Sequence, residues 1–455
     1  MNRLEIRAAV SLAMVFSVRL LGLFMIYPVF ATYARHLIGA TPTRIGLALG
    51  AYGLSQGLLQ IPFGLLSDRI GRKTMITIGL VLFGIGSVVA ALSTTINGVM
   101  VGRIIQGTGA VGSVILALVA DLTREESRTK AMAVVGMTIG LSFLVALITG
   151  PIFTGLIGVS GIFWLMAVLG LVGIAITQWI VPTPRRLVAH RDAETVPSLF
   201  GTVLRNRELL RLDFGIFALH AILTSSFLVM PGILSGAFSV TSETQWTIYL
   251  PVLVVSVLLM IPAIIVAEKH RRMKAIFVTA IVALLASQVA LMLDARSPVV
   301  ILAAIVTFFT AFNLMEASLP SLVTKAAPAG AKGTATGVYS SAQFLGIFVG
   351  GAIGGGIHAL AGATGVFALA AGIAAVWLLI AVTMRKPGHY STYLARLDDI
   401  AASDSKQLEA RLGRVPGVVD VIVVAEESLG YLKIDPDTFD PGAVESIIAK
   451  TAALA

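Results

Sequence analysis

The sequence contains no cysteine, and this absence excludes disulfide bonds, thiolate metal sites and cysteine nucleophiles. It also has few charged residues, because Asp, Glu, Lys and Arg make up only 13% of the chain against roughly 25% in soluble domains. It lacks the glycine-rich phosphate loop of ATP-driven proteins, and no Ser-His-Asp arrangement stands out in a polar region. We therefore expect neither an enzyme nor ATP as the energy source, and neither a cofactor nor a metal.

Hydrophobic residues are abundant instead, at 57% of the 455 residues. Twelve long hydrophobic runs lie near 8–34, 45–66, 75–93, 97–120, 131–157, 161–181, 212–238, 246–267, 275–293, 298–323, 333–361 and 363–384. Each has about the 20 residues that a helix needs to cross a bilayer, and lipid-exposed backbone is stable only in helices or closed barrels. The sequence therefore predicts an all-α membrane protein with twelve transmembrane helices.

Basic residues are distributed unevenly between alternate loops. With the N-terminus inside, the loops on the outer side hold only Arg35, Arg44 and Arg296. Because cytoplasmic loops are enriched in Lys and Arg, we expect both termini in the cytoplasm and the chain in a bacterial inner membrane. The net charge of +9 then marks topology, so the expected partner is the lipid bilayer and not nucleic acid.

The two halves of the chain carry similar charged loops. Asp68 lies four residues before Arg72, and Glu268 lies four residues before Arg272, 200 positions later. Duplicated six-helix bundles that rock about a central site are typical of secondary transporters. We predict an N-terminal bundle, a cytoplasmic linker, a C-terminal bundle and a soluble cytoplasmic domain, at residues 1–181, 182–208, 209–387 and 388–455 respectively.

The loop at 64–74, GLLSDRIGRKT, concentrates charge and glycine in an otherwise apolar region. Gly64 allows a neighbouring helix to approach closely, and Gly71 permits the positive φ that a tight loop often needs. Asp68 at the end of a helix faces the negative end of the helix dipole, so it needs a compensating partner. The bases that hold this loop in the cytoplasm are Arg69, Arg72 and Lys73.

Three stretches resemble motifs of the major facilitator superfamily. The loop at 64–74 resembles its motif A, and VGRIIQGTGA at 101–110 resembles its motif B, with Arg103, Gln106 and Gly107 in place. A third stretch resembles the antiporter motif C, although the paired glycines that usually close it are absent; its residues are Gly140, Gly150, Pro151 and Gly155. With its appended domain, the chain is identified as a drug:proton antiporter-like member of this superfamily.

This resemblance implies a function for the 64–74 loop. In the family, the acid of motif A, here Asp68, meets the N-terminus of a helix from the other half and pairs with Arg72, while Asp121 joins the network. The resemblance therefore implies a latch that stabilises the outward-open state, made of Gly64, Asp68, Arg69, Gly71, Arg72, Lys73 and Asp121. The alternative is that the loop serves only topology and folding.

Ionisable residues within the predicted spans cost about 2.5–3.5 kcal/mol each on insertion scales, so they are candidates for function. They are Arg19, Arg103, Asp213, His220 and Glu316. The resemblance implies that the helices carrying them line a central cavity. Because a carboxyl group whose Arg partner comes and goes can bind and release a proton, we predict Glu316 as the proton carrier and Arg19 as its alternating partner. A permanent ion pair between the halves is the alternative, and Asp213 and His220 are the other titratable candidates.

Five further polar or aromatic residues are possible substrate contacts. They are Tyr27, Gln56, Asn313, Gln343 and Phe344. Helix packing is the competing interpretation of each, because single aromatic residues are common in membrane helices for that reason alone.

The composition changes after residue 387. Residues 391–455 carry eleven acids against six bases, and alternating apolar residues predict strands at STYLARL, VVDVIVVA and GYLKI. Two amphipathic helices complete a β-α-β-β-α order, which predicts a small ferredoxin-like α+β domain. This domain resembles heavy-metal-associated domains, but it lacks their thiol pair, so no metal function carries over.

We expect a secondary active transporter that exports small molecules in exchange for protons by alternating access, functional as a monomer, with the proton gradient as its driving force. Two alternatives stay open. One is a proton-coupled importer of a small metabolite, which the incomplete motif C favours, and the other is a membrane sensor without net transport.

Overall fold

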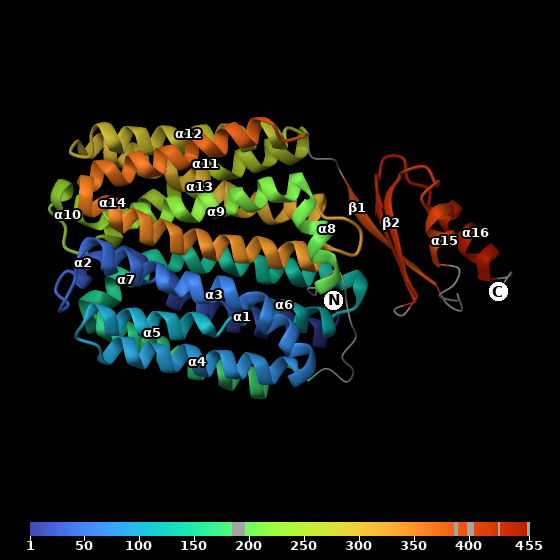
Figure 1. Ribbon diagram of the computed structural model, residues 1–455, viewed down its shortest axis with the longest axis horizontal. Helices are drawn as coiled ribbons and strands as arrows, with labels where there is room; N and C mark the ends of the chain where they lie inside the picture. The colour runs from blue at the N-terminus through green and yellow to red at the C-terminus, as the bar shows by residue number, and fades with distance from the viewer. Residues whose placement is uncertain (184–195, 386–389, 398–404, 426–427, 453–455) are drawn as a thin grey trace. The chain divides into compact units, whose positions relative to one another are not determined.

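The computed structural model describes residues 1–183, 196–385, 390–397, 405–425 and 428–452. Most of them are helical (Figure 1). The helices of the N-terminal half are α1 (Arg3–Phe24), α2 (Tyr27–Ala34), α3 (Pro42–Ile70), α4 (Arg72–Leu92), α5 (Ile96–Thr108), α6 (Gly112–Asp121) and α7 (Glu125–Ala175). A π-helical turn follows at Ile176–Ile180.

A 3-10 turn at Pro197–Leu199 begins the second half. Its helices are α8 (Phe200–Arg205), α9 (Arg207–Phe227), α10 (Met230–Phe238), α11 (Trp246–Lys269), α12 (Met273–Leu293), α13 (Pro298–Ala326) and α14 (Lys332–Val382). The predicted linker at 182–208 falls partly outside the described residues, and the predicted domain boundaries remain predictions.

Nine stretches of the described chain are long and apolar enough to cross a membrane. Two of them are 51 residues long, at Lys130–Ile180 and Lys332–Val382. Each is interrupted by one glycine with positive φ, Gly158 at 69° and Gly362 at 62°. Counting the parts of these two stretches separately and adding α3 gives the twelve membrane helices that the sequence predicts.

The described residues form two compact units. The first lies within 1–187, 211–319 and 337–384, and it contains nearly all of the helical bundle. The second lies within 188–210, 320–336 and 385–455. In the first unit, we call the end that carries residues 68–73 the basic end, and the end that carries the loop at 35–41 the far end.

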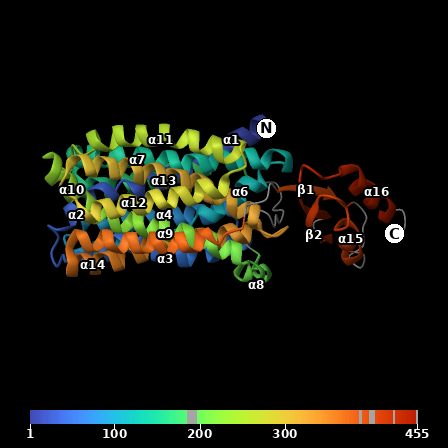
Figure 2. The same ribbon diagram turned by 90° about the horizontal axis from the view of Figure 1, so that it is seen from above.

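Glycine brings α3 and α14 into direct backbone contact towards the far end (Figure 2). A Cβ atom at Gly50 would lie 2.9 Å from the carbonyl oxygen of Phe348, and one at Gly46 would collide with the carbonyl oxygen of Gly351. Such close approach is possible only for residues without a side chain. The far end is therefore closed between these two helices.

Aromatic rings close the same region between other helices. Phe143 of α7 packs on Phe24 of α1 with ring centroids 5.0 Å apart and on Phe312 of α13 at 5.1 Å. Tyr27 of α2 packs edge-on against Phe227 of α9 at 5.6 Å. Rings in these geometries bury large apolar areas and hold the helices together.

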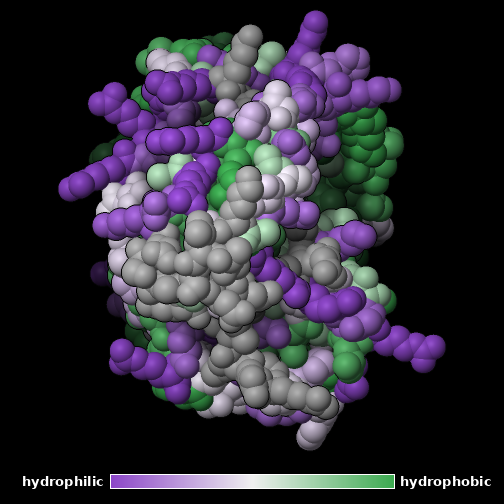
Figure 3. All heavy atoms as spheres, turned by 90° about the vertical axis from the view of Figure 1, so that its right-hand side faces the viewer, coloured by the Kyte–Doolittle hydropathy of each residue, from purple (hydrophilic) through white to green (hydrophobic). Residues whose placement is uncertain are grey.

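The second unit contains the small α+β domain. Its elements are β1 (Ser391–Arg396), α15 (Ser405–Leu412), β2 (Val418–Val424), β3 (Leu429–Ile434) and α16 (Pro441–Ala452). The strands form an antiparallel sheet in the order β1-β3-β2, with Leu408, Leu432 and Val444 in its core. This is the predicted ferredoxin-like order, and the described residues hold no fourth strand. Many hydrophilic side chains project from the face shown in Figure 3, beside white and green areas.

Within this same unit, the small domain contacts the chain around the end of α13. Lys433 Nζ donates to the carbonyl oxygens of Ala326 at 3.4 Å and Ala327 at 3.1 Å. The backbone N–H of Ala329 donates to Asp420 Oδ2 at 2.9 Å. A lysine at the last carbonyls of a helix satisfies acceptors that have no partner within the helix.

Candidate functional site

Polar residues inside the helical unit form two clusters. The first, which we call the arginine cluster, consists of Arg19, Tyr52, Gln56, Gln60 and Arg103. Three of its members recur at every fourth residue of α3, so they share one face of that helix. Arg19 comes from α1 and Arg103 from α5.

Hydrogen bonds and ring contacts connect the arginine cluster. Arg19 Nη2 donates to Gln56 Oε1, and Gln56 Nε2 donates to Gln60 Oε1 at 2.8 Å. The two guanidinium carbons lie 5.8 Å (Arg19) and 5.0 Å (Arg103) from the centre of the Tyr52 ring. Two cations therefore flank one aromatic ring, whose face attracts positive charge.

The charge of this cluster is not balanced by an acid. Arg19 is 2% exposed and Arg103 is 0% exposed. In the described part of the chain, no carboxylate lies within ion-pair distance of either guanidinium. Arg103 Nη1 donates to Gln106 Oε1 at 3.0 Å, but its Nε and Nη2, like Arg19 Nε, have no hydrogen-bond partner.

The second cluster, which we call the carboxyl cluster, consists of His220 on α9, Glu316 on α13 and Gln343 on α14. Gln343 Nε2 donates to His220 Nε2 at 2.9 Å and to Glu316 Oε1 at 3.2 Å. The backbone carbonyl of Ile216 can only accept, so His220 Nδ1 donates to it at 3.2 Å. His220 Nε2 is then the acceptor of the neutral ring, 3.8 Å from Glu316 Oε2.

This cluster can hold protons at two places. The carboxylate of Glu316 and Nε2 of His220 can each gain a proton, and one amide donates to both. Asp213 is a further titratable residue within the spans; it is buried, and neither of its carboxylate oxygens has a hydrogen-bond partner among the described residues. Groups of this kind within a membrane are expected in proton pathways.

The predicted partnership of Glu316 with Arg19 is not formed in this structure. Arg19 bonds to Gln56, whereas Glu316 bonds to Gln343 and faces His220. An alternating partner is bound in only one part of a transport cycle, so the pairing stays a prediction for another state.

At the basic end, the residues of the 64–74 loop form an ion-pair network. Arg72 pairs with Asp68 and with Asp121, whose Oδ2 lies 3.2 Å from Arg72 Nε, and Arg72 Nη1 donates to Ser67 Oγ at 2.6 Å. The side chain of Asp121 is fully buried, while that of Asp68 is 40% exposed. Gly71 has a φ of 101°, as its place in a tight loop predicts.

The other residues of the predicted latch lie around this network. A Cβ atom at Gly64 would lie 3.1 Å from Ser113 Oγ, so α3 approaches α6 closely there. Lys73 donates to the carbonyl oxygens of Gln178 at 3.3 Å and Val181 at 3.1 Å. Arg69 is exposed.

The motif B residues hold helices of the N-terminal half together. Gln106 Nε2 donates to Ser87 Oγ at 2.7 Å, which ties α5 to α4. Gly107 lies against the backbone of Tyr52, where a Cβ atom would collide with a carbonyl oxygen. Motif B thereby positions Arg103 beside the Tyr52 ring.

The motif C residues lie along α7, at Gly140, Gly150, Pro151 and Gly155. Gly150 lies against the backbone of Met25, which brings α7 close to the end of α1. A Cβ atom at Gly155 would lie 3.1 Å from the side chain of Glu243, whereas one at Gly140 would meet no atom within 4 Å.

The five predicted substrate contacts do not lie together in the structure. Gln56 and Gln343 belong to the two clusters. Tyr27 donates to or accepts from Thr224 Oγ1 at 3.1 Å, which joins the halves. The Phe344 ring lies 6.3 Å from that of Tyr52, and Asn313 Nδ2 is buried without a partner among the described residues.

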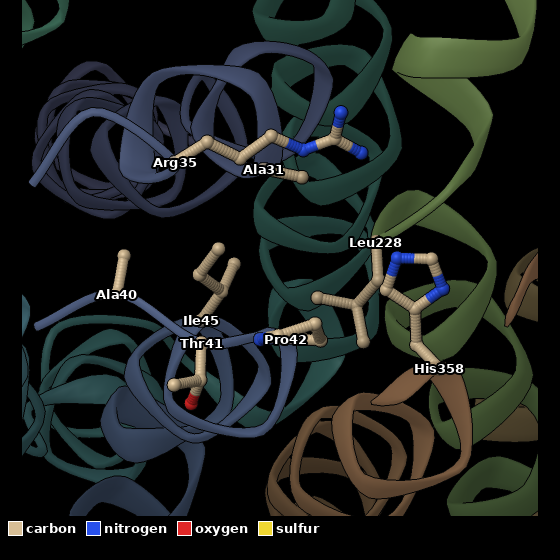
Figure 4. Close-up of a pocket in the computed structure, with 8 residues that line it drawn as sticks. All are labelled: Ala31, Arg35, Ala40, Thr41, Pro42, Ile45, Leu228 and His358. Carbon is tan, nitrogen blue, oxygen red and sulfur yellow. The ribbon is translucent and has the colours of Figure 1, made fainter. Parts of the chain in front are cut away.

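A cavity of about 380 Å³ lies at the far end (Figure 4). Its basic residues are Arg35, after α2, and His358, on α14, and Leu228 and Ile45 are among the apolar residues that line it. It contains neither cluster.

Tyr52 and Gln60 are the site residues that the sequence analysis missed. Their signal was present, because a four-residue spacing places them on the same helical face as Gln56. Neutral polar residues in an apolar run are easily overlooked, whereas charged ones are conspicuous.

The chain matches the family model of the Major Facilitator Superfamily over residues 12–351 and again over 212–407. It is 43% identical to the "Inner membrane transport protein YajR" of Escherichia coli (strain K12), over 98% of this chain and 97% of that protein. It is 32% identical to an "Uncharacterized transporter" of Buchnera aphidicola subsp. Schizaphis graminum, over 85% of this chain and 99% of that one.

Solved structures with the same fold are much more distant in sequence. A bacterial homolog of the human lysosomal transporter Spinster, in an inward-facing and occupied conformation, superimposes with a TM-score of 0.66 at 15% identity, over 85% of this chain and 98% of that one. The nucleoside transporter NupG superimposes with a TM-score of 0.65 at 13% identity, over 83% of this chain and 100% of that one. These likenesses support the fold of the helical bundle.

Proposed function

Because this chain belongs to the major facilitator superfamily of membrane transporters, we propose that it exports small molecules in exchange for protons by alternating access. As a multi-pass inner-membrane transport protein, the chain is not an enzyme. Proton coupling, the outward direction of transport and the cytoplasmic location of both termini belong to the proposal.

The carboxyl cluster is the observation that carries this proposal. Proton-driven transport needs a buried group that is protonated in one part of the cycle and free in another. Glu316 is such a group, because it lies within a membrane span and faces the acceptor nitrogen of His220. A proton on His220 Nε2 removes the acceptor of one hydrogen bond of Gln343, and a proton on Glu316 weakens the other, so both act on the residue that connects α9, α13 and α14.

The proposed orientation places the basic end in the cytoplasm. The far end is then outside, and the contact between α3 and α14 closes the transporter to the outside. The Arg72 network supports the proposed latch, because Asp121 and Arg72 are buried at the cytoplasmic end and Asp68 remains partly exposed. We propose that the carboxylate of Asp68 is partly in contact with solvent here and contacts the N-terminus of a helix from the other half in the outward-open state.

Flux into proteoliposomes tests the proposal. The full chain is reconstituted, a pH difference of each sign is imposed, and movement of ethidium and of 2-naphthoate is followed. We expect probe accumulation against its gradient only when protons flow in the opposite direction. Accumulation with protons flowing in the same direction would establish an importer instead, and no net flux of any probe would favour the sensor.

Glu316→Gln is the decisive variant for coupling. It should abolish accumulation driven by the pH difference while leaving downhill exchange of the probe. Glu243→Gln is the control, because Glu243 is an acid in the loop between α10 and α11, outside the spans. Unchanged pH dependence in Glu316→Gln would show that Glu316 is not the coupling group.

A further inference from the structure

Two buried guanidiniums without an acid are an unusual feature of a membrane helix bundle. The guanidinium group stays protonated, so the arginine cluster holds two positive charges within the spans. The ring of Tyr52 offsets part of their cost, and the amide oxygens of Gln56 and Gln106 each accept one N–H. Cation–π contacts and neutral acceptors are weaker than a carboxylate partner.

The unused donors of Arg103 have a specific geometry. Its Nε and Nη2 are both buried, and neither has a hydrogen-bond partner among the described residues. These two atoms form one edge of the guanidinium plane, and their parallel N–H bonds match the two oxygens of a carboxylate. Arg19 Nε supplies another free donor in the same cluster.

Among the described residues, the acids within the spans are engaged elsewhere or lie apart from the two arginines. Glu316 accepts from Gln343, and its other carboxylate oxygen lies 3.8 Å from His220 Nε2 rather than near either arginine. Asp213, on α9, has no ion pair with Arg19 or Arg103 in the described part of the chain. The positive charge is therefore open to an acid that does not belong to the protein.

Two aromatic side chains lie beside other members of the arginine cluster. The Phe344 ring lies 6.3 Å from that of Tyr52, and a Cβ atom at Gly112, beside Gln60, would lie 3.4 Å from the ring of Phe16. A ligand held here would need one anionic group and an apolar body, because a fully polar molecule would lose its hydration without compensation.

We propose that the arginine cluster binds the carboxylate of an apolar organic acid, with the Nε–Nη2 edge of Arg103 as the bidentate donor and Arg19 as the second cation. Both guanidiniums are enclosed in this structure, so the ligand reaches them when the halves separate. Because this separation of the halves is part of alternating access, the inference rests on the proposed function. The inference adds that the transported compounds are organic anions.

Binding is measured without any gradient, so that it is independent of transport. The full chain in detergent is heated with 2-naphthoate, with 2-naphthamide or with 2-naphthylmethylammonium at constant ionic strength. A ligand that binds the folded state raises the unfolding temperature according to its affinity. We expect stabilisation by 2-naphthoate, and none by its neutral and cationic analogues.

Variants locate the site. Arg103→Gln should weaken 2-naphthoate binding at least about tenfold, as expected for the loss of a charged hydrogen-bond pair. Arg103→Lys should weaken it too, because lysine keeps the charge but lacks the planar edge. Arg35→Gln, in the far-end cavity, is the matched control and should bind as the original chain does.

The unliganded variants provide a second measurement. Removing an unbalanced buried charge should leave the unfolding temperature of Arg103→Gln without ligand unchanged or higher. Glu316→Gln tests whether the arginine cluster binds the ligand or the chain's own Glu316. If the cluster binds the ligand, this variant should leave the affinity for 2-naphthoate within about twofold of the original value.

Several outcomes would overturn the inference. One is equal stabilisation by 2-naphthamide and 2-naphthoate, and another is unaltered 2-naphthoate binding in Arg103→Gln. A third is 2-naphthoate binding that is detected only in Glu316→Gln, because Glu316 would then be the acid that this cluster binds. Proton-driven flux of ethidium without 2-naphthoate binding would refute this inference alone. Binding of 2-naphthoate without any flux would refute the proposed function alone.

Discussion

Replacing Gly50 by leucine should hold the far end open. A Cβ atom at this position would lie 2.9 Å from the carbonyl oxygen and 3.0 Å from the Cα atom of Phe348, whereas carbon atoms in contact normally lie about 3.5–4.0 Å apart. Alanine alone would thus require a separation of about 0.5–1 Å. Helices that pack through side chains of ordinary size have axes about 8–10 Å apart. Because leucine at position 50 would place such a side chain between α3 and α14, we expect these two helices to separate by about 2–3 Å.

The energetic consequence falls on one state only. Overpacking costs about 1–3 kcal/mol, and it applies while the two backbones are in contact. If the closed state is favoured by less than this cost, the population shifts to the open state, and a closed state favoured by a similar free energy falls to about half of the population. Transport would slow in the first case, because the cycle requires both states.

The absence of cysteine makes the measurement direct. Spin labels at Thr41→Cys and Leu360→Cys, both exposed at the far end, report the distance between α3 and α14 without background labelling. Gly84→Leu is the matched control, because a Cβ atom at Gly84 meets nothing within 4 Å. If Gly50→Leu left the distance distribution and the transport rate unchanged, the glycine contact would not be what closes this end.

Two further predictions concern stability. Asp121→Asn should lower the free energy of unfolding by about 3–5 kcal/mol, because it removes the fully buried carboxylate that pairs with Arg72. Asp68→Asn, at a 40% exposed side chain, should cost no more than about 1 kcal/mol. Equal losses of thermal stability in detergent would contradict the burial argument. Leu408→Ala should cost the small domain about 2–5 kcal/mol, since Leu408 is 0% exposed in its core. Limited proteolysis should then remove this domain and leave the helical bundle in the membrane, and loss of the whole chain from the membrane would contradict that independence.

The helical architecture could be predicted from the sequence because hydrophobic runs of membrane length have few alternatives in lipid. The small domain was equally readable, since STYLARL, VVDVIVVA and GYLKI fall on β1, β2 and β3. The breaks within spans were not predicted. The chain interrupts its helix at Met25–Ile26, at 109–111 and at 228–229, where hydropathy stays high.

The site was predicted in part. Charged residues in apolar runs are conspicuous, so Arg19, Arg103 and Glu316 could be named as candidates. Gln56, Gln106 and Gln343 were named too, but not as their partners, because contacts across helices depend on how each helix is rotated, and one sequence does not contain that information. Arg19 bonds to Gln56 from α3, and Glu316 bonds to Gln343 from α14.

Gln343 has only two amide hydrogens, and both are used. One goes to the imidazole nitrogen of His220 and the other to the carboxylate of Glu316, so this arrangement requires an unprotonated imidazole nitrogen and is strongest while Glu316 is ionised. Under the proposed proton coupling, a proton on the imidazole nitrogen would displace the Gln343 side chain, which belongs to α14, the helix whose glycines meet α3. A single amide would thus link the arrival of a proton to the helix that closes the far end.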